Sequence, residues 1–288
     1  MEKFVQRAKT LIEALPYIKK FNSKTIVFKY GGSIGSKDFS NFARDIVLMK
    51  LVGINPVIVH GGGAEISKVL KSLKIESNFI DGLRVTCPKT MEVVEMVLGG
   101  KVNKEIVSKI IMNGGKSVGI SGKDGGFLRV KKVKASKKSQ DLGRVGEITK
   151  VDIKLISELQ DNGYIPVVAP IGSDNKGVSY NINADHAASK IASSLKAEKL
   201  IILTDVPGIQ DEKRKLISSI TKKTANSLIR KGVIAKGMVP KVKCLVQALM
   251  DGVNKAHIID GRIPHAVILE TFTDSGIGTE ILLWGSSE

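Results

Sequence analysis

The chain has 288 residues, of which 42% are hydrophobic and 25% charged, an ordinary globular composition with enough length for a large core. These values exclude a disordered, collagen-like or coiled-coil protein, and no apolar run approaches the roughly 18 residues that a membrane-spanning helix needs. The N-terminal residues lack the continuous apolar stretch of a secretory signal. We therefore expect a cytoplasmic protein, or a stromal one if the source is a plastid.

Residue counts also limit the kinds of site. The 2 cysteines, Cys87 and Cys244, lie far apart without CxxC spacing, and the 4 histidines are scattered, so we expect no disulfide framework and no metal site in the protein itself. Lys and Arg number 45 against 28 Asp and Glu, a net charge of +17, but aromatic residues make up only 5%. A basic nucleic-acid-binding or regulatory protein is therefore a secondary alternative to an enzyme with an anionic substrate.

Short β-branched runs alternate with helical patterns along the whole chain, which is the rhythm of a mostly parallel sheet covered by helices. Predicted strands span 25–29, 56–60, 117–121, 127–134, 144–151, 165–169, 200–204 and 256–259. Predicted helices span 40–52, 64–74, 89–112, 152–162, 184–195, 221–230 and 239–250, with a final helix or turn at 265–271. The strands at 127–134 and 144–151 are expected to form an antiparallel hairpin.

The first 24 residues carry an apolar stripe at helical spacing and precede the first predicted strand. The stripe consists of Val5, Ala8, Leu11, Ile12 and Leu15. Pro16 is expected to end or kink this helix. Because the segment has no core position of its own, we expect it to pack against another subunit, with packing on its own subunit as the alternative.

Two predicted strands end in glycine-rich sequences, KYGGS at 29–33 and VIVHGGG at 57–63. In open α/β sheets, ligands bind at the carboxyl ends of the strands, and glycines there allow backbone N–H groups to approach an anion. The second sequence leads into a helix, whose N-terminus favours negative charge. Either loop alone could be a tight turn, but two at equivalent strand ends predict a phosphate-binding edge.

Several common catalytic motifs are missing from the sequence. The GKS at 115–117 has Ile110 where a Walker A loop needs its first glycine, and it precedes a strand instead of joining a strand to a helix. No GxGxxG follows a strand, and no GxSxG is present. The sequence therefore does not support a P-loop ATPase, a dinucleotide enzyme or a serine hydrolase.

Three further motifs lie near predicted strand ends or helix starts. NINADHAA at 181–188 opens a helix with a polar cluster, for which N-capping by Asn or Asp is a sufficient explanation. TDVPGI at 204–209 follows a strongly apolar strand. KGMVPK at 236–241 places Lys241 near a helix N-terminus, where the macrodipole disfavours a cation unless an anion lies nearby.

Six motifs stand in the order and approximate spacing of the amino acid kinase family, and the chain resembles that family from about Thr10 to Ile281. The motifs are KYGGS, VIVHGGGAEI, DGLRVT at 81–86, NINADHAA, TDVPGI and GMVPK. GLRVT discriminates best between branches of the family, because it resembles the corresponding motif of the branch that phosphorylates N-acetyl-L-glutamate. The resemblance implies a three-layer αβα sandwich with a central, mostly parallel eight-stranded sheet.

The resemblance also implies a division of the chain. Residues 1–24 would form the N-terminal helix, 25–172 an acetylglutamate-binding lobe, and 173–288 a lobe that binds ATP and carries a regulatory signature. The boundary would lie near residues 170–176, which are rich in turn-forming types.

Site residues are implied one by one. The catalytic residues would be Lys29, Lys241, Asp185 and Gly32, with the two lysines neutralising the transferred phosphoryl group and Asp185 orienting both. Acetylglutamate would be held by Gly62, Gly63, Arg84 and Asn181. ATP, carrying Mg²⁺, would contact Asp205, Val206, Pro207, Gly208, Ile209, Gln210, Val233, Ile234 and Ala235.

The expected reaction is phosphorylation of the γ-carboxylate of N-acetyl-L-glutamate to N-acetyl-L-glutamyl 5-phosphate, the second step of arginine biosynthesis. A Glu-like carboxyl has a pKa of about 4.3, so the acceptor is already ionised and needs no general base. A related acceptor such as aminoadipate is the runner-up within the family.

The C-terminal sequence 265–279 resembles the arginine-site signature of arginine-inhibited, hexameric members of the family. Tyr17, His265, Glu270 and Gly276 would bind L-arginine, and the N-terminal helix would link three dimers into a hexamer. The stretch AHIIDGRIPHAVILETFTDSGIGT is most similar to the cyanobacterial and plastid type, which implies PII signalling protein as a further partner.

Overall fold

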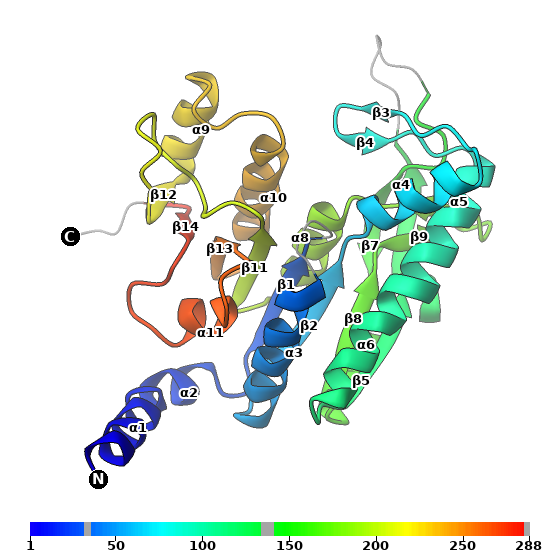
Figure 1. The fold of residues 1–288 in the computed structure, drawn as a ribbon. Helices are drawn as coiled ribbons and strands as arrows, with labels where there is room; N and C mark the ends of the chain where they lie inside the picture. The colour runs from blue at the N-terminus through cyan, green and yellow to red at the C-terminus, as the bar shows by residue number, and fades with distance from the viewer. Residues whose placement is uncertain (32–35, 134–140, 285–288) are drawn as a thin grey trace.

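The computed structural model describes residues 1–31, 36–133 and 141–284, and its centre is an eight-stranded sheet (Figure 1). The strand order is β12-β14-β13-β11-β1-β2-β8-β5. β13 and β14 run antiparallel, and every other neighbouring pair in this sheet runs parallel. The strands are β1 (Thr25–Tyr30), β2 (Asn55–His60), β5 (Ser117–Ser121), β8 (Ile165–Ala169), β11 (Lys199–Thr204), β12 (Ser219–Thr221), β13 (Lys255–Asp260) and β14 (Thr279–Leu282). The expected mostly parallel, eight-stranded architecture is confirmed.

Helices cover both faces of this sheet, because its central strands are apolar on both sides. In β1, Val27 packs in one core and its neighbours Ile26 and Phe28 pack in the other. The Val27 face is covered by α7 (Lys154–Asp161), α8 (Ala184–Ser194), α9 (Lys222–Arg230) and α10 (Met238–Met250). The Phe28 face is covered by α3 (Ser36–Leu51), α6 (Asn103–Met112) and α11 (Ala266–Thr271).

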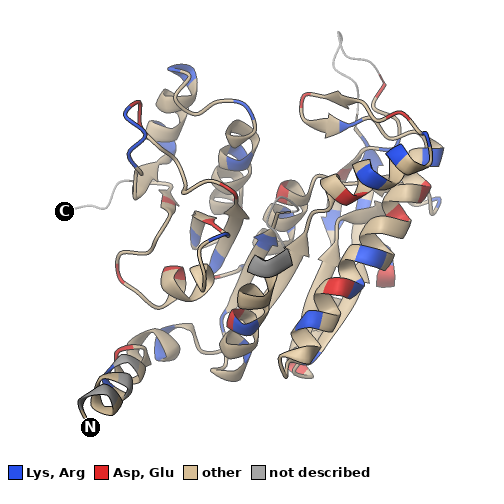
Figure 2. Ribbon diagram, in the orientation of Figure 1, with Lys and Arg blue, Asp and Glu red and all other residues tan. Residues whose placement is uncertain are grey.

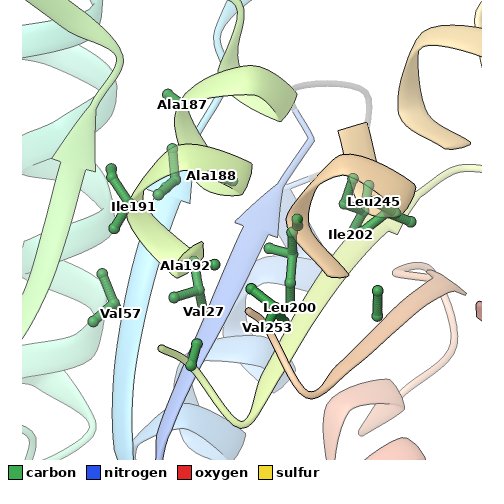
Figure 3. Packing of buried hydrophobic residues seen from close by; sticks show 14 of the residues in the cluster. Val27, Val57, Ala187, Ala188, Ile191, Ala192, Leu200, Ile202, Leu245 and Val253 are labelled. Carbon is green, nitrogen blue, oxygen red and sulfur yellow. The ribbon is translucent and has the colours of Figure 1, made fainter. Parts of the chain in front are cut away.

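Small side chains bring α8 close to the sheet. Ala188, Ile191 and Ala192 of this helix pack beside Val27 and Val57 of the two central strands (Figure 3). The distance between packed elements depends on the size of the side chains at the contact. The alanines therefore hold the N-terminus of α8 next to the carboxyl end of β1, which places the functional site.

A second, four-stranded sheet has the order β10-β9-β6-β7. Its strands are β6 (Leu128–Lys132), β7 (Gly146–Val151), β9 (Ile171–Ser173) and β10 (Ser179–Asn181). The predicted antiparallel hairpin of β6 and β7 is confirmed. The β9–β10 hairpin was not expected, and it contains the stretch 170–176 in which we placed the lobe boundary. Asp174 holds its turn by accepting hydrogen bonds from the amides of Lys176 and Val178. The boundary itself stays a prediction.

The predicted helix at 89–112 is one continuous helical run with a π-helical centre. It consists of α5 (Pro88–Glu95), the π-helix η1 (Met96–Val102) and α6. Together with α4 (Gly63–Ser72), α5 and η1 enclose a third, smaller core. The remaining elements are the short hairpin of β3 (Phe79–Ile80) with β4 (Leu83–Arg84) and the 3₁₀ turn η2 (Asp124–Gly126).

The N-terminal segment forms two helices, α1 (Glu2–Glu13) and α2 (Leu15–Phe21), with Pro16 in the first turn of the second. α1 extends away from the body of the molecule (Figure 1). Leu11 and Ile12 are 73% and 62% exposed, whereas Phe21 is buried in the core beneath the sheet. The helical prediction is confirmed, and α2 is anchored to the subunit while the apolar residues of α1 face solvent.

Lys and Arg residues are scattered over helices and loops (Figure 2). None of the described helices combines the length and apolar character that a membrane span requires.

Candidate functional site

Among the described residues, those predicted for catalysis and for substrate binding gather at the edge of the sheet formed by the carboxyl ends of β1, β2 and β11. β1 lies at the centre of the strand order, with β2 on one side and β11 on the other. The chain connections on the two sides of β1 therefore run in opposite directions. In open α/β sheets, such a reversal creates the crevice in which ligands bind.

Lys29, Asp185 and Lys241 form one buried ionic cluster. Lys29 lies two residues after Val27 in β1, so it points toward the same face and meets α8. Asn183 is the N-cap of α8 and accepts hydrogen bonds from the amides of Asp185 and His186. The carboxylate of Asp185 lies 3.0 Å from Lys29 Nζ through Oδ1 and 2.8 Å from Lys241 Nζ through Oδ2.

The N-cap interpretation of NINADHAA is therefore confirmed for Asn183, and the functional interpretation of Asp185 stays a prediction. Asn183 caps the helix, and Asp185 projects from its first turn into the site. Lys241 lies in the first turns of α10, where the macrodipole disfavours it, and Asp185 is the nearby anion that the sequence led us to expect.

Burial sets the electrostatics of this cluster. Lys29 and Asp185 are each 7% exposed. Burial lowers the pKa of Lys29, and the Asp185 carboxylate only partly offsets that effect. Burial alone would raise the pKa of Asp185, but the two lysines outweigh it and hold this pKa below its usual value. With one carboxylate for two ammonium groups, the cluster keeps an excess positive charge that suits an anionic group.

A cavity of about 180 Å³ brings together all four residues predicted to bind the acceptor. Its lining includes Gly62, Gly63, Arg84 and Asn181, and it extends to Asn183 and Ala184 at the start of α8. Sites for drug-sized ligands have volumes of roughly 300–1,000 Å³, so this cavity suits a small metabolite.

Arg84 is held rigidly at one wall of this cavity. Its guanidinium donates to Ser77 Oγ, to Gly63 O at 2.8 Å and to Ser67 Oγ at 2.9 Å, and it stacks over the Phe79 ring at 4.6 Å. Burial lowers the pKa of Arg84, but an arginine stays charged in proteins. An arginine has five N–H donors, so the three bonds to protein acceptors leave two that can be directed at a carboxylate.

The predicted ATP residues occupy two loops at the β11 end of the site. The first follows β11, and the second joins α9 to α10. Gly208 has a φ of +144°, and a Cβ there would lie 2.7 Å from Thr279 Oγ1, so this position requires glycine. Ile209 and Ile234 are buried in the same core, which fixes both loops. Asp205 and Ala235 are exposed.

Gly32, the remaining predicted catalytic residue, lies outside the described residues.

A second cavity, of about 140 Å³, contains three of the four predicted regulatory residues. Tyr17, Glu270 and Gly276 all line it. His265 does not, and its Nδ1 lies 2.6 Å from Oδ1 of Asp45 on α3. His265 was implied by the resemblance of residues 265–279 to an arginine-site signature, but the histidine in this cavity is His257. A histidine within the apolar strand β13 was the signal that could have identified it.

Glu270 is the centre of this second cavity. Its Oε2 accepts hydrogen bonds from the amides of Ile277 and Gly278, and its Oε1 lies 2.5 Å from His257 Nδ1. Burial raises the pKa of Glu270, but His257 and the Ile277 amide outweigh it and keep this pKa low. At Gly276, φ is +60° and a Cβ would lie 2.8 Å from Glu270 Oε2, so glycine is required there.

Both signs of charge line the second cavity. Its lining includes Lys20, Lys199 and Lys255 together with Glu270, Asp274 and Glu280. Tyr17 Oη donates to Asp274 Oδ1 at 2.5 Å, which connects α2 to the wall opposite. Such a cavity suits a zwitterionic ligand.

Within the part of the chain that the structure describes, no three His, Cys, Asp or Glu side chains are grouped closely enough to hold a metal ion.

Known proteins similar to this chain agree with this geometry. The model of the amino acid kinase family matches residues 24–260. The acetylglutamate kinase of Persephonella marina is 52% identical over 98% of this chain and 100% of its own length. N-acetylglutamate synthase from Neisseria gonorrhoeae, in complex with coenzyme A and N-acetyl-glutamate, aligns with a TM-score of 0.87 at 26% identity over 96% of this chain. This chain spans 64% of the synthase. The same synthase in complex with coenzyme A and L-arginine aligns at 0.82 and 25% identity, over 94% of this chain and 64% of the synthase.

We predict that Asp185→Asn lowers the free energy of unfolding at pH 7 by about 3–5 kcal/mol, because it leaves two partly buried lysines without a counter-charge. The folded-state pKa of Lys29 would fall further below its unfolded value, so the unfolded state would bind more protons and stability would rise with pH. Urea unfolding at pH 7 and at about pH 9.5 measures this effect. The difference in free energy of unfolding between wild type and Asp185→Asn should be smaller at the higher pH, because Lys29 loses its proton.

The control is Asp251→Asn, which removes a partly exposed ion pair with Lys190 and should change stability by less than about 1 kcal/mol. An Asp185→Asn deficit of the same size at both pH values would show that the lysine charges are not its cause.

Proposed function

The chain belongs to the amino acid kinase family, and from this premise we propose that it transfers the γ-phosphoryl group of ATP to the γ-carboxylate of N-acetyl-L-glutamate. The product is N-acetyl-L-glutamyl 5-phosphate, an intermediate of arginine biosynthesis. The observation that carries the proposal is the buried cluster of Lys29, Asp185 and Lys241 beside a cavity that Arg84 and two glycines line.

The proposed chemistry needs positive charge and positioning but no base. A carboxylate oxygen of the acceptor attacks the γ-phosphorus, a P–O bond forms, and the bond to the oxygen bridging the β- and γ-phosphorus breaks with release of ADP. The acceptor is already ionised near neutral pH. Lys29 and Lys241 neutralise the oxygens of the transferred group, and the amides of Gly62 and Gly63 point donors at it.

Arg84 and Asn181 are proposed to hold the rest of the acceptor. Arg84 lies at the cavity wall with its plane fixed by Ser67 and Phe79, and Asn181 Nδ2 donates to Thr86 Oγ1 at 3.3 Å. Aminoadipate-type acceptors have one more methylene, and a substrate panel would separate the two.

The nucleotide is proposed to bind at the exposed parts of the two loops after β11 and between α9 and α10. Residues 205–210 and 233–235 would contact it, and Mg²⁺ would arrive with its phosphates as part of the substrate. Asp185 is engaged by both lysines, so it serves as their orienting group.

The function is tested by trapping the acyl phosphate with hydroxylamine in the presence of ATP, Mg²⁺ and acetylglutamate. We expect hydroxamate formation by the wild type and a loss of about 10²-fold in kcat in Lys241→Ala, because one charge aimed at the transition state is gone. KM values should change much less than kcat. Wild-type protein that forms no hydroxamate with acetylglutamate would refute the proposed function.

Arg84→Lys should raise the KM for acetylglutamate about tenfold or more, while the KM for ATP stays nearly constant. The reason is that an ammonium cannot reproduce the contact of a planar guanidinium with the acceptor. Steady-state kinetics with each substrate varied in turn gives both values. Lys68→Arg, an exchange between the same two residue types on α4, is the matched control. Equal damage to both KM values would place Arg84 outside the acceptor pocket.

L-arginine is proposed to bind the second cavity and inhibit the enzyme. The guanidinium would face the carboxylates of Glu270 and Glu280, and the α-carboxylate would face the lysines and the amides around Gly276. The structural relative that was determined with L-arginine supports this ligand. The apolar residues of α1 are exposed, which supports pairing with α1 of another subunit and a hexamer of linked dimers. A PII partner and a cytoplasmic location stay predictions.

We predict sigmoidal inhibition by arginine, and we predict that deletion of residues 1–13 yields active dimers of reduced arginine sensitivity. This deletion removes the exposed α1 but keeps the buried Phe21 and the cavity wall at Tyr17. Light scattering and inhibition curves measure both effects, with Leu51→Ala, which removes another exposed apolar side chain, as the control. A full-length dimer that is indifferent to millimolar arginine would contradict this prediction and leave the kinase proposal intact.

A further inference from the structure

His60 is a fully buried histidine next to the candidate active site, and the proposed mechanism does not use it. It is the last residue of β2 and is 0% exposed. Ile58, two residues earlier, packs in the core under α3 and α6, so His60 points toward that face. Lys29 and Asp185 meet on the opposite face of the sheet. His60 therefore cannot contact the transferred phosphoryl group.

Both ring nitrogens of His60 have partners, and these assign its tautomer. Nδ1 lies 3.0 Å from Gly61 O, which can only accept, so Nδ1 carries the proton. Nε2 lies 3.2 Å from Asn103 Nδ2 and accepts from it. The amide orientation of Asn103 is fixed in turn, because Nδ2 also donates to Val167 O at 2.9 Å and Oδ1 accepts from Lys104 Nζ at 3.2 Å.

Burial keeps the ring neutral, since it lowers the pKa of His60 to about 4. Near neutral pH the ring is thus a single tautomer with one donor directed at Gly61 O.

The carbonyl that His60 holds belongs to the same peptide unit as the Gly62 N–H. In a trans peptide, the C=O and the following N–H point in opposite directions. Gly62 is the N-cap of α4 and Gly63 is its first residue, so their amides make no bond within the helix. Because His60 draws Gly61 O toward itself, the Gly62 N–H points in the opposite direction, away from His60.

The π-helical segment packs against this loop from behind. A Cβ on Gly62 would lie 2.5 Å from Leu98 Cδ2 of η1. Asn103, the residue directly after η1, is buried and reaches His60 because Gly119 on β5 leaves room, where a Cβ would lie 1.7 Å from Asn103 Oδ1. Short π-helical segments inside α-helices are frequent at functional sites. Here, one such segment supplies the side chain that contacts Gly62, and the residue directly after it orients His60.

We propose that His60 and Asn103 are positioning residues for phosphoryl transfer, which fix the Gly61–Gly62 peptide so that the Gly62 N–H is directed at the transferred group. This inference rests on the proposed function, and it adds a residue pair that touches neither substrate. A peptide free to rotate would place the carbonyl oxygen of Gly61, instead of a donor, near an anionic group.

The matched substitutions His60→Asn and His60→Gln separate this role from packing. The side-chain nitrogen of asparagine stands where Nδ1 stands in histidine, so it can still donate to Gly61 O, whereas the amide of glutamine reaches the Nε2 position. Glutamine is closer to histidine in volume, so a packing role predicts that His60→Gln is the milder variant. The proposed role predicts the reverse order.

We expect His60→Gln to lower kcat about 10²-fold, as loss of one transition-state donor does, and His60→Asn to lower it at least tenfold less. The KM values for ATP and acetylglutamate should change less than about threefold in both variants, since the lost interaction acts on the transition state. Ile106→Val, a buried substitution one turn along α6, is the control for a general packing defect. A kcat for His60→Gln equal to or above that of His60→Asn would overturn the proposal.

Nitrogen-15 NMR of the wild-type protein with labelled histidine gives a second test that does not depend on turnover. The His60 signals, assigned by their absence in His60→Asn, should show protonated Nδ1 and unprotonated Nε2 between pH 6 and pH 8. Protonated Nε2 would overturn the proposal. Wild-type protein without kinase activity would instead refute the proposed function, and the tautomer would still decide whether His60 holds Gly61 O.

Discussion

The carboxylate of Asp185, shared by Lys29 and Lys241, is the interaction on which the rest of the site depends. It joins β1, α8 and α10, three elements more than 50 residues apart in sequence, at one point. Two buried ammonium groups without this carboxylate would be too costly to keep. The alanines of α8 bring its N-terminus close enough to β1 for this contact. The charge cluster therefore depends on the packing of the core.

The same charges explain why the proposed mechanism assigns no role to a catalytic histidine or serine. The acceptor is already an anion, and the obstacle is its approach to a polyanion, so fixed cations and amide dipoles are the useful groups. His60 is compatible with such a site, because its low pKa keeps the ring neutral. A histidine beside Gly61 that gained and lost a proton near neutral pH would make the electric field at the site depend on pH. A neutral donor holds the peptide in one orientation.

Sequence patterns predicted the long elements, because β-branched runs, glycine loops and helix caps are local signals, whereas Arg84 and Asn181 were implied by the family resemblance. The elements that were missed, such as β9 and β10, are only three residues long, and their pairing depends on contacts with β6 that no local pattern records. The π-helical segment within 89–112 was also not predicted, because no local pattern in the sequence records it. His265, which the family resemblance implied, does not line the second cavity. His257 reaches Glu270 from β13, and no local motif links the two.

The two cavities lie at opposite edges of the sheet, which limits how they can communicate. The second cavity includes Lys199 and Lys255, the first residues of β11 and β13, whereas Lys29 and the glycines 61–63 lie at the carboxyl ends of β1 and β2. A six-residue strand is roughly 20 Å long, about twice the distance over which charges remain unscreened at physiological salt. Any coupling must therefore pass through packed elements. Packed elements connect the two edges: α11 carries Glu270, its N-cap His265 contacts Asp45 of α3, and Phe42 of α3 packs against Phe28 of β1. The residue that sequence reasoning assigned to the arginine cavity thus lies on the path between the two sites.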